Sequence, residues 1–250
     1  MSPTPALDLV HDVEGRAFRA WPALETRPVG GWIQRLSGGY TKRANSINAL
    51  DIEPAFAVDL IPTLEAPYHE RGLPPVWRLS PLAPAAADAA LAAKGYRRID
   101  ETFVQRVPLA GRGFALDPEV TIAAAPSTAW LDGFASLSPV APQHRDAMTK
   151  MLAMIAAPVG FLSVADKGAL VAFALGVVDG DHVGIFDVLV APSARRRGLA
   201  RRLTESLCAW GTQHGARFAY LQVVATNAAA LPLYARLGFE TVYSYAYRVP

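Results

Sequence analysis

One segment, residues 186–200, constrains the fold of this chain more than any other. It begins as an apolar strand, turns at Pro192, and passes through three arginines and Gly198 into a helix. The start of a helix offers unpaired backbone N–H groups and the positive end of the helix dipole, and both stabilise a bound anion. Arginine adds charge-assisted hydrogen bonds to phosphate oxygens. The segment therefore predicts a strand, a loop and a helix start that hold a pyrophosphate.

A second helical segment begins at Asn227 and ends near Gly238. Asparagine at a helix start caps a backbone N–H and keeps other side-chain valences for a ligand. Tyr234 lies about two turns later on the same face of the predicted helix. A capped amphipathic helix whose tyrosine packs in the core explains the same pattern, and both interpretations can hold together.

Together the two segments resemble the acyl-CoA motifs of the GNAT superfamily of N-acetyltransferases. That family combines Val-x-Pro-x-x-Arg-x-x-Gly-x-Gly/Ala with a downstream Asn-x-x-Ala-x-x-x-Tyr-x-x-x-Gly-Phe helix. The matching residues here are Val190, Pro192, Arg195, Gly198 and Ala200, followed by Asn227, Ala230, Tyr234, Gly238 and Phe239. The resemblance covers roughly residues 118–250. It implies an α/β (α+β) GNAT acyltransferase fold, with a mixed central sheet flanked by helices.

The resemblance also implies roles for individual residues. The strand would contact the pantetheine arm of acetyl-CoA, the loop and helix start would hold the pyrophosphate, and Asn227 would contact the cofactor arm. The implied cofactor-binding residues are Val188, Leu189, Val190, Arg195, Arg196, Arg197, Gly198, Leu199, Ala200 and Asn227. In the implied reaction, a neutral amine attacks the thioester directly in a ternary complex, and a strand amide stabilises the oxyanion. Tyr234 then protonates the CoA thiolate or orients a water that does so.

Asp187 is the best-placed carboxylate for the amine, three residues before Val190. A lysine-like amine with a pKa of about 10.4 costs roughly 4.6 kcal/mol to deprotonate at neutral pH, so such an acceptor needs a base. We therefore predict Asp187 as the second catalytic residue, acting as a base or in acceptor binding. The competing interpretation is a strand-end aspartate bonded to a neighbouring hydroxyl or arginine. Gly184 stands where histone-directed members place a catalytic glutamate.

The first half of the chain repeats the ending of the second half. Gly95-Tyr96 leads into an extended segment that ends in Arg-Val-Pro, and Gly238-Phe239 does the same. We predict a tandem duplication, with a degenerate GNAT-like domain over residues 1–110 and the catalytic domain over residues 111–250. Asp51 and Glu53 stand where the first domain would need its phosphate loop, so we expect one acyl-CoA per chain.

The polar stretch at residues 38–46 has two interpretations. It either faces the acceptor cleft or forms a hairpin with a solvated edge, and we favour the hairpin.

The composition narrows the class of partner. Lys and Arg number 24 against 22 Asp and Glu, for a net charge of +2, which argues against nucleic-acid and membrane partners. The single cysteine, Cys208, suits a reducing compartment, and neither a signal peptide nor a membrane span is apparent, so we expect a cytoplasmic protein. We expect no metal cofactor, and the sequence leaves open whether the protein forms a homo-oligomer.

The sequence thus predicts an acetyl-CoA-dependent N-acetyltransferase that acts on a small primary amine. Acetylation of a protein or peptide amine is the nearest alternative. A non-catalytic acyl-CoA-binding sensor is an alternative from another class. Nucleic-acid binding through the arginines of residues 195–202 is disfavoured, because no wider basic face accompanies them.

Overall fold

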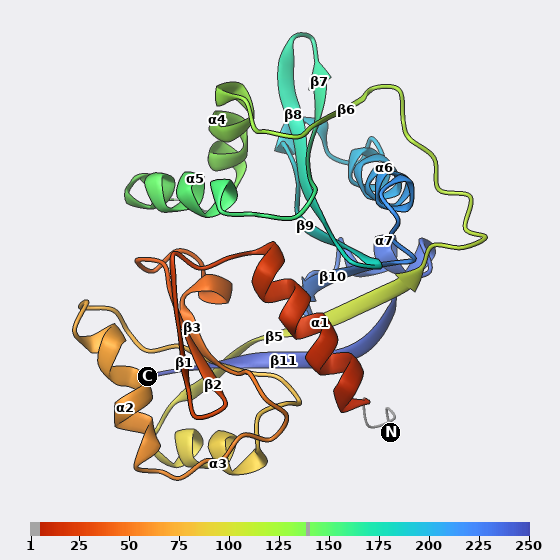
Figure 1. Ribbon diagram of the computed structural model, residues 1–250. Coiled ribbons are helices and arrows are strands. Elements are labelled where there is room, and N and C mark those ends of the chain that lie inside the picture. Colours follow the sequence, from red (N-terminus) through yellow and green to blue (C-terminus); the bar gives the residue numbers. More distant parts are fainter. Residues whose placement is uncertain (1–5, 139–140) are drawn as a thin grey trace.

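A computed structural model describes residues 6–138 and 141–250, and its strands form one continuous mixed sheet (Figure 1). The strand order is β1-β2-β3-β4-β11-β5-β10-β9-β8-β7-β6. The strands are β1 (Glu25–Val29), β2 (Trp32–Leu36), β3 (Ser46–Ala49), β4 (Trp77–Leu79), β5 (Arg97–Pro108), β6 (Val120–Ala123), β7 (Val159–Asp166), β8 (Ala169–Asp179), β9 (His182–Val190), β10 (Phe218–Val224) and β11 (Glu240–Val249).

Helices flank this sheet, so the mixed α/β class predicted from the sequence is confirmed. The α-helices are α1 (Leu7–Ala20), α2 (Leu60–His69), α3 (Ala85–Ala93), α4 (Thr128–Leu137), α5 (Arg145–Ala153), α6 (Leu199–Gln213) and α7 (Leu231–Arg236). Short 3-10 helices are η1 (Lys42–Ala44), η2 (Pro142–His144) and η3 (Pro192–Ala194). None of the described helices is long and apolar enough to cross a membrane.

The two halves of the chain exchange their last strands. In the first half, β3 and β4 are parallel, and the strand beside β4 is β11 from the end of the chain. In the second half, β9 and β10 are parallel, and the strand beside β10 is β5 from the first half. The two exchanged strands pair with each other, antiparallel, at the waist of the molecule (Figure 1). This symmetric order fits the predicted duplication, while the boundary at residues 110/111 stays a prediction.

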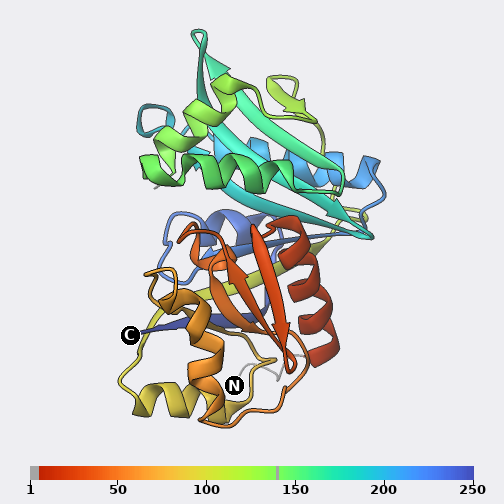
Figure 2. The same ribbon diagram turned by 60° about the vertical axis from the view of Figure 1, so that its left-hand side comes forward.

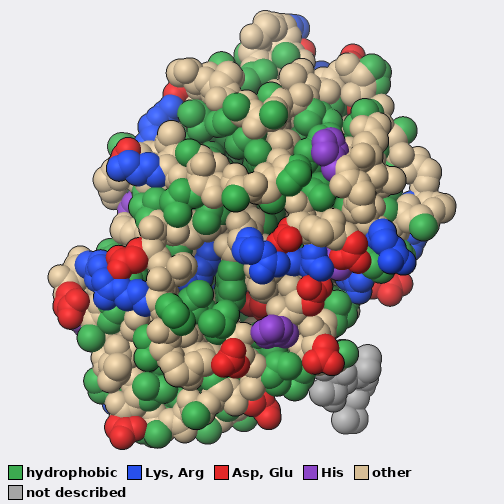
Figure 3. Space-filling model, in the orientation of Figure 1, with side chains coloured by type: hydrophobic (Ala, Val, Ile, Leu, Met, Phe, Trp, Pro, Cys, Tyr) green, Lys and Arg blue, Asp and Glu red, His purple; other side chains and the backbone are tan. Residues whose placement is uncertain are grey.

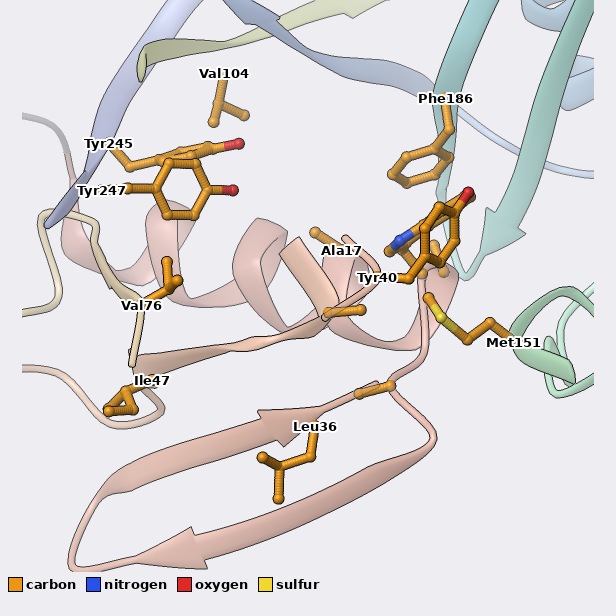
Figure 4. Close-up of a cluster of buried hydrophobic side chains, with 14 of the residues drawn as sticks. Ala17, Leu36, Tyr40, Ile47, Val76, Val104, Met151, Phe186, Tyr245 and Tyr247 are labelled. Atoms are coloured by element: carbon orange, nitrogen blue, oxygen red, sulfur yellow. The ribbon is translucent and has the colours of Figure 1, made fainter. Parts of the chain in front are cut away.

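Two apolar cores lie on opposite faces of the second-half sheet. Helix α6 packs on β7, β8 and β9 on one face, and α4 packs on β8 and β9. Figure 2 shows α4 and α5, in green, on the face opposite α6, in blue. The core under α4 and α5 continues into the first half, whereas the core under α6 and α7 belongs to the second half and the end of β5. Figure 4 shows part of the continuous core, where Tyr40 of the first half lies between Phe186 and Met151 of the second.

A buried charge network ties α1, β4 and β11 together. The Arg78 guanidinium donates to both carboxylate oxygens of Glu14, with 2.9 Å from Nη2 to Oε1. The Tyr243 hydroxyl donates to the same carboxylate at 2.6 Å, and the guanidinium lies 3.6 Å from the ring centroid of Tyr245. The Glu14 and Arg78 side chains are only 2% and 3% exposed, so each buried charge is compensated by the other.

Arginines of α1 also pair with aspartates at the turn between β8 and β9. Arg16 Nη2 lies 3.1 Å from Asp181 Oδ1, and Arg19 Nε lies 2.7 Å from Asp179 Oδ2. Figure 3 shows basic and acidic side chains gathered along the waist between the halves. The first half thus supplies cations and the second half supplies anions at this contact.

Two predicted elements differ in part from those of the structure. The helix expected from Asn227 is α7, which begins only at Leu231. The hairpin that we favoured for residues 38–46 is confirmed, because this segment connects β2 to β3 and the two strands pair antiparallel. Its expected solvated edge is wrong, because the connection forms a turn and η1 in which Tyr40, Ala44 and Asn45 are buried.

Loss of the buried carboxylate is expected to destabilise the whole fold. Glu14→Gln keeps the side-chain shape but leaves Arg78 as an uncompensated buried charge, so the free energy of unfolding should fall by about 3–5 kcal/mol. Urea denaturation measures this change. The control is Glu25→Gln, since Glu25 pairs with Arg27 at the surface, where such a loss costs about 0–1 kcal/mol. Equal losses in the two variants would contradict the assignment of Glu14 as a central tie.

Candidate active site

A β-bulge opens the sheet at the centre of the site. The register between β8 and β9 shifts between the pairs Leu175–Phe186 and Phe173–Leu189, which leaves one extra residue on β9. Asp187 lies in this bulge with a φ of +49°. Pairing between β9 and β10 ends at Ile185, although β10 continues to Val224. The last residues of β9 therefore diverge from β10, and their backbone groups face a wedge.

A groove of about 710 Å³ occupies this wedge. Its walls come from β9, the loop after it, the start of α6, the α7 region and the end of α4. The lining residues are Ser136, Leu137, Val188, Leu189, Val190, Pro192, Ala194, Arg195, Arg196, Gly198, Leu199, Ala200, Arg201, Asn227, Ala229, Ala230, Leu233 and Tyr234. A groove of this size is in the range of small-molecule and cofactor sites.

The loop after β9 forms the electropositive end of the groove. Gly198 is the N-cap of α6 with a φ of +78°, a left-handed conformation that glycine adopts without strain. No side chain caps the N-terminus of α6, so the N–H groups of its first turn remain available for an anion. Arg195 and Arg196 line the groove beside these groups. A cradle of backbone N–H groups with two guanidinium groups is suited to a pyrophosphate.

The remaining arginines of the cluster have partners elsewhere. Arg197 Nη1 lies 2.6 Å from Asp166 Oδ2, and Arg197 does not line the groove. Arg202 Nε lies 2.6 Å from Asp117 Oδ2. Arg201 does line the groove, and its Nε also donates to Glu205 at 2.9 Å. The cationic support of the groove therefore centres on Arg195 and Arg196.

The α7 side brings Asn227 and Tyr234 to the same groove. Asn227 Oδ1 accepts a hydrogen bond from the Ala230 N–H at 3.1 Å, so the asparagine caps the turn that precedes α7. Tyr234 is 8% exposed. Burial, with the nearby charge of Asp187 as a second cause, raises the pKa of Tyr234 to about 12. At neutral pH the phenol therefore keeps the proton that an acid catalyst needs.

Asp187 lies beside the groove rather than in its lining. Its Oδ1 accepts a hydrogen bond from Arg43 Nη2 at 2.8 Å, and its side chain is 23% exposed. The pKa of Tyr40 is raised by burial and then by the charge of Asp187, as is that of Tyr234. The bulge thus places the Asp187 carboxylate in electrostatic contact with tyrosines of both halves.

Ten of the twelve site residues expected from the sequence line the groove, and only Asp187 and Arg197 do not. Sequence reasoning missed the end of α4, at Ser136 and Leu137, because its motifs begin only at β9. It also did not single out Arg43, whose one signal was its place in the polar stretch of residues 38–46. The placement brings the residues together and leaves their roles as predictions.

The structure also bears on the single cysteine and on metal binding. Cys208 is fully buried in α6, and burial raises the pKa of its thiol to about 12, which is consistent with packing. Within residues 6–138 and 141–250, no three His, Cys, Asp or Glu side chains are grouped to hold a metal ion.

Comparisons with known proteins extend these findings. A family model described as "Probable histone acetyltransferase Rv0428c C-terminal" matches residues 9–248. The "Uncharacterized N-acetyltransferase YobR" of Bacillus subtilis is 29% identical, over 97% of this chain and 99% of the relative. "Probable histone acetyltransferase Rv0428c" of Mycobacterium tuberculosis is 31% identical, over 89% of this chain and 68% of the relative. The solved GCN5-related N-acetyltransferase from Kribbella flavida has a TM-score of 0.65 and 16% identity, covering 98% of this chain and 96% of that one.

The fold, the diverging strands and these relatives define the class, an N-acetyltransferase with the GNAT fold. Within that class the chain belongs to the family of the Rv0428c C-terminal region, because the family model spans nearly all of it. The resemblance stated from the sequence motifs is confirmed.

A negative side chain at the helix start should abolish cofactor binding. Gly198→Glu places a carboxylate where the pyrophosphate is expected, and calorimetry should show no acetyl-CoA binding, against one equivalent per wild-type chain. Gly215→Glu is the matched control. Both glycines have a positive φ and open space around an added Cβ, but Gly215 follows the C-terminal end of α6. Loss of binding in both variants, or in neither, would contradict the assignment of the loop.

Proposed function

We propose that this chain transfers the acetyl group of acetyl-CoA to the primary amine of a small molecule. The observation that carries the proposal is the groove between β9 and α7. It joins a strand edge suited to a pantetheine arm, a helix start suited to a pyrophosphate and a protonated tyrosine. Val188, Leu189 and Val190 would contact pantetheine, the loop and helix start would hold the pyrophosphate, and Asn227 would contact the cofactor arm.

The reaction needs two proton movements. The amine nitrogen forms a bond with the thioester carbonyl carbon, and a β9 amide donates to the oxyanion that results. The C–S bond then breaks, and the CoA thiolate takes a proton from Tyr234 or from a water that Tyr234 orients. The amine proton passes to Asp187, directly or through water.

The surroundings of Asp187 favour a small acceptor. Helix α1 of the first half covers β9 near the bulge, and η1 brings Arg43 against Asp187. The space that remains among Trp21, Arg43 and Phe186 has a volume of only about 10 Å³. A small amine can enter beside such a covered strand more readily than a folded protein surface can.

A protein amine is the second candidate. It is supported by the printed names of the matched family and of the Mycobacterium tuberculosis relative, both of which refer to a histone acetyltransferase. The two candidates differ in how the amine reaches the bulge. A protein amine must extend there from a larger surface, whereas a small-molecule amine can enter whole.

A screen of acceptors tests the proposed function. Purified protein, acetyl-CoA and a library of amino acids, polyamines, aminoglycosides and histone peptides would be analysed by mass spectrometry, with free CoA as a second readout. The expected result is a product about 42 Da heavier than the small amine, because an acetyl group replaces one hydrogen atom. Turnover confined to histone peptides would favour the second candidate, and acetyl-CoA binding without any turnover would indicate a sensor.

Removal of one hydroxyl tests the proton donor. Tyr234→Phe keeps the buried ring, so the acetyl-CoA dissociation constant should stay unchanged while kcat falls by about 10²–10⁴. Steady-state kinetics and calorimetry measure the two quantities. Tyr220→Phe is the control, because the Tyr220 hydroxyl is buried without a hydrogen-bond partner among the described residues and Tyr220 does not line the groove. An unchanged kcat in Tyr234→Phe, where chemistry limits the rate, would leave Tyr234 with a packing role only.

A further inference from the structure

An arginine of the first half reaches the bulge of the second half. Arg43 lies in η1, 144 residues from Asp187 in sequence, and its Nη2 donates to Asp187 Oδ1 at 2.8 Å. Both side chains are largely buried, with 22% and 23% exposed. Neither lines the acyl-CoA groove, so this contact lies on another side of the bulge from the expected cofactor.

Aromatic rings of both halves hold the Arg43 guanidinium. Its Cζ lies 4.8 Å from the ring centroid of Trp21 and 5.8 Å from that of Phe186, and these two rings are stacked. Burial alone would lower the pKa of Arg43, but the charge of Asp187, its hydrogen bond and the nearby Tyr245 and Tyr247 together outweigh burial, so the pKa of Arg43 is raised. The residue is therefore a fixed cation with one defined orientation.

A second arginine anchors the backbone of Arg43. Arg35, 2% exposed, donates from Nη1 to the Arg43 carbonyl oxygen at 2.5 Å and from Nη2 to the Phe18 carbonyl oxygen at 3.1 Å. These bonds tie η1 to the C-terminal end of α1. The backbone of Arg43 is thus held by contacts within the first half, independently of its hydrogen bond to Asp187.

The contact differs from the other ion pairs between the halves. Arg16 and Arg19 already tie α1 to aspartates at the β8–β9 turn, away from the groove. Asp187 instead lies at a left-handed bulge position and acts electrostatically on Tyr234. An ion pair that only joined the two halves would not need a carboxylate at this bulge position.

We propose that Arg43 is a positioning residue of the transferase site, which holds the Asp187 carboxylate in the direction that the acceptor amine requires. The first half thereby completes the acceptor side of a site whose cofactor side belongs to the second half. This inference rests on the proposed function for the reaction that Asp187 serves. Misplacement of a reacting group by about 1 Å can cost on the order of 10² in rate, which sets the expected effect.

Kinetics of Arg43 variants test the proposal. Arg43→Met removes the charge but keeps an apolar stem against Trp21 and Phe186. Its kcat should fall by about 10 to 10²-fold, with the acetyl-CoA dissociation constant unchanged. The double variant with Asp187→Asn should be no slower than Asp187→Asn alone, because both changes remove the same positioned carboxylate. In Arg43→Ala, added guanidinium ion should restore part of kcat.

Arg19→Met is the matched control, since it also removes an arginine of the first half that pairs with an aspartate of the second half. It should leave kcat at the wild-type value. Equal losses in Arg43→Met and Arg19→Met, strictly additive effects in the double variant, or wild-type kinetics in Arg43→Met would overturn the proposal.

Crystal structures of the wild type and Arg43→Met test the geometry without turnover. The Asp187 side chain should hold one rotamer in the wild type and lose it in the variant, and an unchanged rotamer would also overturn the proposal. Failure of the wild type to acetylate any amine would reject the proposed function, while these two structures would still decide the role of Arg43.

Discussion

The pairing of β5 with β11 is the interaction on which the rest of the structure depends. Each strand closes one half of the chain in sequence but completes the sheet of the other half in space. Without β11 and β5, the strands β4 and β10 would each expose an edge of unpaired backbone groups, which favours aggregation. The buried pair of Glu14 and Arg78 reinforces the exchange, because Tyr243 of β11 donates to it. The halves are therefore parts of one scaffold.

The same exchange sets the geometry of the site. Because β5 pairs with β10 up to Val224, β10 is held along its length on that side, and only its β9 side can open. The bulge at Asp187 turns the end of β9 away from β10, and the groove lies between the two diverging strand ends. Helix α1 and η1 lie over the same strand because the first half is held close. One bulge thus lies beside the groove and also contacts Arg43.

The sequence predicted the features that depend on neighbouring residues. Pro192, the arginines and Gly198 predicted the loop and the start of α6, because helix starts and left-handed turns depend on nearby residues. The repeat of the Arg-Val-Pro endings indicated two related strands but not that they exchange, because strand pairing depends on distant residues. Sequence also gives the charge of a long side chain without its direction. Arg197 was expected in the groove and pairs with Asp166, and Arg43 was not expected at Asp187.

The expected difference between the halves in anion binding has a structural basis beyond the acidic residues of the first half. Between β3 and α2, the N–H groups of Leu50 and Asp51 both donate to the Gly31 carbonyl oxygen, at 2.9 and 3.0 Å. The N–H of Glu53 donates to the Leu82 carbonyl oxygen at 2.8 Å. These three backbone donors are thus already bonded, whereas no side chain caps the start of α6 beside Arg195 and Arg196. Replacing Asp51 and Glu53 by neutral residues would remove repulsion without freeing these donors. We therefore still expect the first half to offer no anion site of its own.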